Sequence, residues 1–161
     1  MHDPRRGRTE LSIARWTESE WHKLWLMLRT RPWLTLALVP GASDVSGELT
    51  LGAAVQLSRT GATHLRSPIH VADATTISLQ SLATLTQELE LCKQSGAPVL
   101  IALPSVTENP AALSIARQAE TVLLCAICEQ TNLGDIKATI AEVGQNRFVG
   151  SVMFHGDALE K

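Results

Sequence analysis

The chain has 161 residues, of which 45% are hydrophobic and 19% charged, with a formal net charge of -2 at pH 7. This length allows one hydrophobic core without disulfides or a structural metal, and the charge gives no broad attraction for nucleic acid. No apolar run reaches the roughly 18 residues that a membrane helix needs, and three cysteines fit a reducing compartment. We therefore expect a cytoplasmic protein. Tyrosine is absent, and all four tryptophans lie within the first 33 residues.

Short apolar runs alternate with helical patterns along the chain. Continuous apolar runs predict strands that are buried on both faces, here over residues 33–39, 69–72, 98–103, 121–128 and 148–154. Helices are predicted over residues 18–29, 49–58 before a turn at Gly61, 78–93, 111–119 and 134–143. The expected inward stripe of the third helix is Leu79, Leu82, Leu85, Leu89 and Cys92.

This order of elements predicts an α/β fold in three layers. The sheet is expected to be mostly parallel, with about five strands and with helices on both faces. We see no linker or repeat, so a single domain should span residues 1–161, with residues 1–15 as a flexible tail.

The loop at residues 40–50, PGASDVSGELT, lies between the first strand and its helix, where a phosphate-binding loop would be found. Such a loop needs glycines, a lysine for the phosphate charges and a Ser or Thr for magnesium. Glu48 stands after Gly47 in place of that lysine. We favour an ordinary connection with an acidic first helical turn. The residues of this degenerate loop are Gly41, Ser43, Asp44, Ser46, Gly47, Glu48 and Thr50.

Other segments before and after the loop occur in a recognisable order. Residues 28–30 read LRT, residues 71–74 read VADA, residues 98–105 read PVLIALPS and residues 111–128 read AALSIARQAETVLLCAIC. With the loop, these segments resemble the cytoplasmic P-loop ATPase domain of bacterial tyrosine kinases of capsule and exopolysaccharide synthesis, which are relatives of the MinD and ParA ATPases. The resemblance implies a P-loop NTPase-like fold over nearly the whole chain.

The departures from that family fall on its catalytic parts. The Walker A lysine is replaced by Glu48, the Walker B aspartate falls at Ala102, and only Asp73 remains of the second acidic motif. The family's acceptor tyrosines are absent. The resemblance therefore implies a catalytically inactive scaffold or regulatory subunit with no cofactor or metal. Its partner would be a membrane chain-length, polymerase or export protein, which places the chain in the cytoplasm or at the inner face of the membrane.

A second hypothesis keeps a nucleotide in the site. The chain would then be a noncanonical ATPase or switch of the MinD or ParA type, acting in cell-surface positioning or division. It would bind ATP or ADP with Mg²⁺, and Arg59, Arg66 or a partner's residue would replace the missing lysine.

The helix at residues 18–29 carries an apolar stripe of Trp21, Trp25 and Leu28. Packing onto its own domain and contact with another molecule are equally compatible with this pattern, because tryptophan is also enriched at interface hot spots. In the resembled kinases the helix carries an E-x-x-R-x-x-R pattern for ring assembly, of which only Arg29 is kept here. The four residues are our interface candidates, in a homo-oligomer.

Three further patterns favour ordinary structural roles. Cys125 and Cys128 have C-x-x-C spacing, but residues three apart on a strand face opposite sides of the sheet. His64, His70 and His155 have no second ligand at helical spacing, so we expect no metal site. Ser43, Ser46 and Ser105 do not occur in a nucleophile-elbow motif.

Overall fold

The structure is a computed structural model that describes residues 17–43, 45, 47–128 and 130–155. The expected tail at residues 1–15 lies outside this range. The helices are α2 (Glu18–Leu28), α3 (Gly47–Leu65), α4 (Leu79–Ser95), α5 (Pro110–Gln118), α6 (Leu133–Val143) and the 3-10 turn η1 (Gln145–Arg147). The strands are β1 (Thr35–Pro40), β2 (His70–Asp73), β3 (Val99–Ala102), β4 (Thr121–Cys128) and β5 (Phe148–His155). All five strand runs and all five helical patterns expected from the sequence are present.

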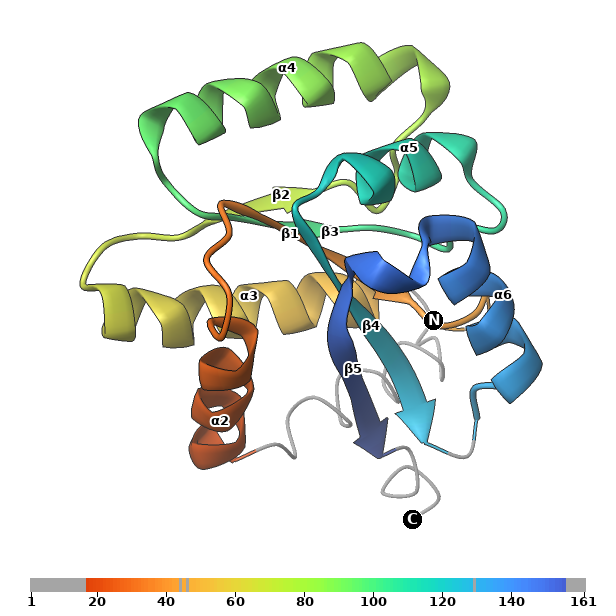
Figure 1. The fold of residues 1–161 in the computed structure, drawn as a ribbon, viewed down its shortest axis with the longest axis horizontal. Helices are drawn as coiled ribbons and strands as arrows, with labels where there is room; N and C mark the ends of the chain where they lie inside the picture. Colours follow the sequence, from red (N-terminus) through yellow and green to blue (C-terminus); the bar gives the residue numbers. More distant parts are fainter. Residues whose placement is uncertain (1–16, 44, 46, 129, 156–161) are drawn as a thin grey trace, which may run out of the picture.

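The five strands form one sheet in the order β2-β3-β1-β4-β5, and every neighbouring pair is parallel. Helices α2 and α3 cover one face, and α4 and α5 cover the other (Figure 1). The predicted three-layer α/β fold is confirmed, and it is consistent with a P-loop-like arrangement. The sheet is wholly parallel in the described range.

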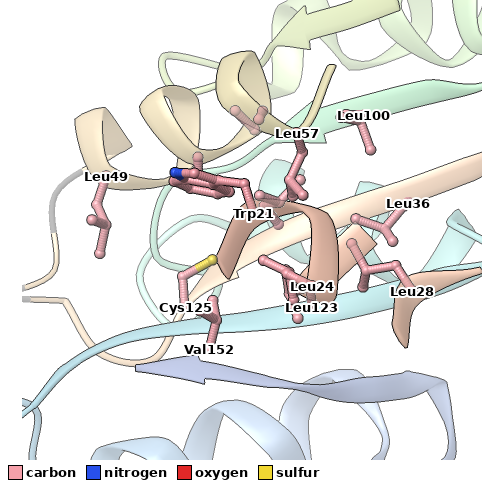
Figure 2. Close-up of a cluster of buried hydrophobic side chains, with 14 of the residues drawn as sticks. Trp21, Leu24, Leu28, Leu36, Leu49, Leu57, Leu100, Leu123, Cys125 and Val152 are labelled. Atoms are coloured by element: carbon pink, nitrogen blue, oxygen red, sulfur yellow. The ribbon is translucent and has the colours of Figure 1, made fainter. Parts of the chain in front are cut away.

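Each face of the sheet has its own hydrophobic core, because alternate residues of the buried strands point to opposite sides. Leu36, Leu38 and Leu123 lie in the core beneath α2 and α3, which Figure 2 shows in close-up. Ala37 and Val39 lie in the second core, beneath α4, α5 and α6. The continuous apolar runs of the sequence therefore reflect burial on both faces.

Helix α3 is longer than the predicted 49–58. The helix continues through Gly61 and ends at Leu65. The next residue, Arg66, adopts a left-handed backbone conformation with φ 57°. Gly61 is a point of close approach, not a turn, because a Cβ atom there would lie 2.5 Å from the Trp25 ring and would also meet Ile69. Glycine therefore allows α2 to pack directly on the backbone of α3.

The inward stripe of α4 also differs from the prediction. Leu89 is buried, and Leu82, Leu85 and Cys92 are partly buried against the second core. Leu79, however, is 63% exposed. It is the first residue of the helix after the Ser78 cap, so it lies beyond the end of the surface that the other leucines cover. Among the described residues, no helix is both long and apolar enough to cross a bilayer.

Candidate functional site

The topology places a switch point at the carboxyl ends of the neighbouring strands β1 and β3. The chain leaves β1 through α3 on one face of the sheet, whereas it leaves the adjacent β3 through α5 on the opposite face (Figure 1). In open α/β sheets, ligands bind at such a switch point. The loop after β1, the start of α3 and the loop after β3 meet there, where Thr50 contacts the Leu103 carbonyl.

The described part of the loop after β1 is packed into the protein. The Gly41 amide donates to the Cys125 carbonyl at 2.7 Å, and Thr139 of α6 donates to the Gly41 carbonyl at 3.2 Å. Ala42 and Val45 are 2% and 3% exposed, whereas Ser43 is exposed. Asp44 and Ser46 lie outside the described residues. The side chains of Ala42 and Val45 therefore fill the core instead of framing a ligand.

Thr50 uses its hydroxyl within the fold. Its side chain is fully buried, and its Oγ1 lies 3.0 Å from the Gly47 carbonyl oxygen and 2.9 Å from the Leu103 carbonyl oxygen. The second contact ties the first turn of α3 to the end of β3. A hydroxyl engaged with two carbonyls in the core is not presented to a magnesium ion at the surface. This use of Thr50 has no signal in the sequence, because Leu103 lies 53 residues away.

Asp73 and Ala102 occupy matched positions at the ends of β2 and β3. Ala102 is buried and faces α3, so the switch point has no carboxylate at this position. Asp73 accepts hydrogen bonds from the Thr75 amide at 3.1 Å and the Thr75 hydroxyl at 2.6 Å. Thr75 packs on Gly47, because a Cβ atom added at Gly47 would lie 3.0 Å from the Cβ atom of Thr75. The structure therefore brings Asp73 and Thr75 beside the start of α3.

The loop sequences that follow β1, β2, β3 and β4 contain acidic residues and neither lysine nor arginine. No lysine or arginine occurs in residues 32–58, 67–92, 94–116 or 118–136, which include the loops after β1, β2, β3 and β4. The acidic residues in these loops or at their helix starts are Asp44, Glu48, Asp73, Glu108, Glu129 and Asp135. Helices begin at this edge, and acidic groups there stabilise the helix dipoles. The same charges oppose a bound polyphosphate.

The arginines proposed as substitutes for the lysine lie far from the loop. At about 1.5 Å rise per residue, Arg59 lies about 16 Å farther along α3 than Glu48. Arg66 follows the far end of that helix, beside the amino end of β2. Within this chain, neither arginine reaches phosphates held at the start of α3, so this part of the nucleotide hypothesis is wrong.

The tryptophan stripe of α2 is part of the core. Trp21, Trp25 and Leu28 are 5%, 2% and 0% exposed, and they pack on α3 and the sheet (Figure 2 labels Trp21 and Leu28). Their own domain covers these side chains, which is the first of the two alternatives that the spacing leaves open. The sequence could not decide this point, because a helix shows the same spacing whether its apolar face meets its own sheet or another molecule.

Arg29, the fourth interface candidate, is engaged by its own chain. Its guanidinium lies 5.0 Å from the centre of the Trp33 ring and 5.7 Å from that of Trp25, and Nη1 donates to the Trp33 carbonyl at 3.2 Å. These contacts fix the turn between α2 and β1. The guanidinium of Arg29 therefore has partners within its own chain.

The cysteines behave as the strand geometry predicts. Cys125 is buried beneath α2 and α3, and Cys128, three residues later on β4, is half-buried. Burial removes the Cys125 thiolate from water and raises the pKa of this thiol to about 12. The thiol therefore stays protonated at neutral pH, and thiolate chemistry is excluded at this residue.

The remaining polar candidates are scattered. Ser105 is 8% exposed and shares a hydrogen bond of 3.0 Å with the Thr107 hydroxyl. A shallow cavity of about 200 Å³ lies between the end of β2 and α4, lined by Asp73, Ser81, Thr84 and Glu88 among others. It holds no base or cation that would pair with these carboxylates. The His155 side chain lies outside the described part of the chain. His64 contacts His22, a residue that the sequence pattern does not single out.

Comparison with known proteins gives this chain no family. No protein-family model matches it, and no curated protein matches it. The assignment of a function consequently depends on the residues and their geometry.

Proposed function

We propose that the chain is a non-catalytic, P-loop-like protein-binding domain that serves as a scaffold or regulatory subunit in bacterial exopolysaccharide synthesis and export. The supporting observation is the state of the switch point, where Thr50 is engaged with backbone carbonyls and the surrounding loops carry carboxylates without lysine or arginine. Phosphoryl transfer works by positioning and by neutralising charge. An edge of this composition supplies neither a phosphate-binding lysine nor a magnesium carboxylate at Ala102.

The pathway and the partner of this proposal come from the sequence resemblance. The partner is a chain-length, polymerase or export protein of the membrane, and the domain acts at the cytoplasmic face, as a homo-oligomer. Trp21, Trp25 and Leu28 are enclosed in the domain, so a self-association surface has to use other residues. The exposed side of α2, with Lys23 and Leu26, is available for such a contact.

Nucleotide addition is expected to leave the melting temperature unchanged. The free energy gained from a ligand at 100 times its dissociation constant is about 2.7 kcal/mol, which corresponds to a rise of several degrees for a domain of this size. Melting curves with millimolar ATP or ADP and Mg²⁺ would therefore reveal nucleotide binding as a rise in the melting temperature. A reproducible rise that is lost on omission of the nucleotide would overturn the non-catalytic assignment.

Deletion of the gene is expected to reduce the amount or the chain length of the surface polysaccharide, and the intact gene should restore it. Glu48→Gln and Asp73→Asn are expected to restore it equally well, because both side chains are exposed and neither performs chemistry in a scaffold. Polysaccharide quantity and size distribution are the measurements. Unchanged polysaccharide in the deletion strain contradicts the pathway, whereas failure of either folded variant contradicts the non-catalytic role.

A further inference from the structure

Two histidines from different helices meet on the surface beside the first core. His22 of α2 and His64 of α3 are 42 residues apart, yet Nδ1 of His22 lies 2.7 Å from Nε2 of His64. The ring centres are 4.9 Å apart, with an angle of 62° between the ring planes. The His22 side chain is 33% exposed, and His64 is exposed, so solvent and small ions reach both rings.

The helix packing beneath the pair sets this separation. Trp25 follows His22 by three residues on α2, and Gly61 precedes His64 by three residues on α3, so each lies about one turn from its histidine. The Trp25 ring sits directly over Gly61. The two helices are thereby held close, one turn away from the imidazoles, by a contact that only glycine permits.

Glu18 lies near the nitrogen of His22 that does not contact His64. Its Oε1 lies 4.0 Å from Nε2 of His22, on the side of the ring away from His64. Metal-binding histidines typically direct their other N–H toward a carboxylate, which fixes the tautomer and raises the basicity of the ligating nitrogen. With its proton on Nε2, His22 presents the Nδ1 lone pair toward His64.

We propose that His22 and His64 form a binding site for a divalent transition-metal ion such as Zn²⁺, which bridges α2 and α3. Zinc–nitrogen bonds of about 2.0 to 2.1 Å in tetrahedral geometry place two ligating nitrogens about 3.3 Å apart. In the structure the two nitrogens share a hydrogen bond of 2.7 Å, so the ion takes the place of the shared proton and small rotations of the two solvent-accessible rings widen the separation. His64 then carries its proton on Nδ1, and Nε2 binds the ion.

Water completes the coordination. Among the described residues, no group of three or more His, Cys, Asp or Glu side chains is placed to hold a metal ion. The chain therefore supplies two nitrogen ligands and leaves the other positions open. Imidazole suits zinc, copper and nickel more than magnesium or calcium, which prefer oxygen ligands. The ion ties the start of α2 to the end of α3, independently of any role at the carboxyl edge.

Zinc titration of the untagged, chelator-stripped protein against a chromophoric chelator tests this site at slightly alkaline pH. One equivalent is expected to bind in the wild type. Glu18→Gln should lower the zinc affinity roughly 10- to 100-fold, the usual effect of losing a carboxylate beside a ligating histidine. His22→Gln and His64→Gln should each lower the zinc affinity by more than this. In melting experiments, zinc should raise the melting temperature of the wild type and of neither histidine variant.

His70→Gln is the matched control, because His70 is exposed and lies on β2, not on either of the two helices that carry the pair. It should bind zinc as the wild type does. If cysteines elsewhere bind zinc, the amount that they bind would be the same in all variants. Melting curves without metal verify that each variant is folded. The proposal is overturned if the wild type binds no zinc, or if His22→Gln and His64→Gln bind it as tightly as His70→Gln.

Discussion

Replacing Trp25 with alanine is expected to lower the free energy of unfolding by about 3 to 5 kcal/mol, the usual cost of truncating a buried Trp or Phe. The ring is 2% exposed, lies over Gly61 and meets the Trp33 ring edge-on at a centre distance of 5.9 Å. Its loss leaves a cavity between α2 and α3 and removes one aromatic face beneath Arg29. Natural domains have only about 5 to 15 kcal/mol of stability, so this change removes a large share of it.

Denaturant unfolding followed by circular dichroism measures this effect, because the α/β sheet gives a strong cooperative signal. Leu26→Ala is the matched control on the same helix. Leu26 is 59% exposed, and surface substitutions usually change the free energy of unfolding by less than about 0.5 kcal/mol. If Trp25→Ala instead leaves stability unchanged and lowers the oligomer mass in light scattering, the ring belongs to an intermolecular contact and the packing described here is wrong.

The strands and the order of layers could be predicted from the sequence because a parallel sheet buried on both faces requires continuous apolar runs. The start of α5 is a similar case. Asn109 accepts hydrogen bonds from the amides of Ala111 and Ala112, and Pro110 occupies the first helical position. Both signals lie within a few residues of the helix start, so the usual preference for Asn at the N-cap and Pro at the first helical position predicts the start correctly.

The features that decide the candidate site depend on distant residues. The sequence shows that Glu48 replaces a lysine, but the use of the Thr50 hydroxyl depends on the Leu103 carbonyl. The pairing of His22 with His64 likewise spans 42 residues and matches no helical spacing. Packing between elements creates both contacts, and a pattern within one element cannot indicate them.

Gly61 illustrates the same limit, since within a sequence a glycine after an apolar helix indicates a turn. In the structure it occupies the contact between two helices, and its missing side chain leaves the space that Trp25 fills. Gly61→Ala should raise the intrinsic helix propensity by about 1 kcal/mol. Against this gain, a Cβ atom 2.5 Å from the ring is a severe overlap. Overpacking a core costs about 1 to 3 kcal/mol, so we expect net destabilisation in the wild type.

The sign of this effect should reverse when the ring is removed. In a Trp25→Ala background the overlap with the indole is absent, and the remaining neighbour is the end of the Ile69 side chain, which can turn into the cavity that the indole leaves. The crowding is thereby relieved, and the gain in helix propensity remains. Gly61→Ala is therefore expected to destabilise the wild type and to stabilise the Trp25→Ala variant. Denaturant unfolding of the four proteins gives the coupling energy directly. Equal effects of Gly61→Ala in both backgrounds would mean that Trp25 does not limit the approach of α2 to α3.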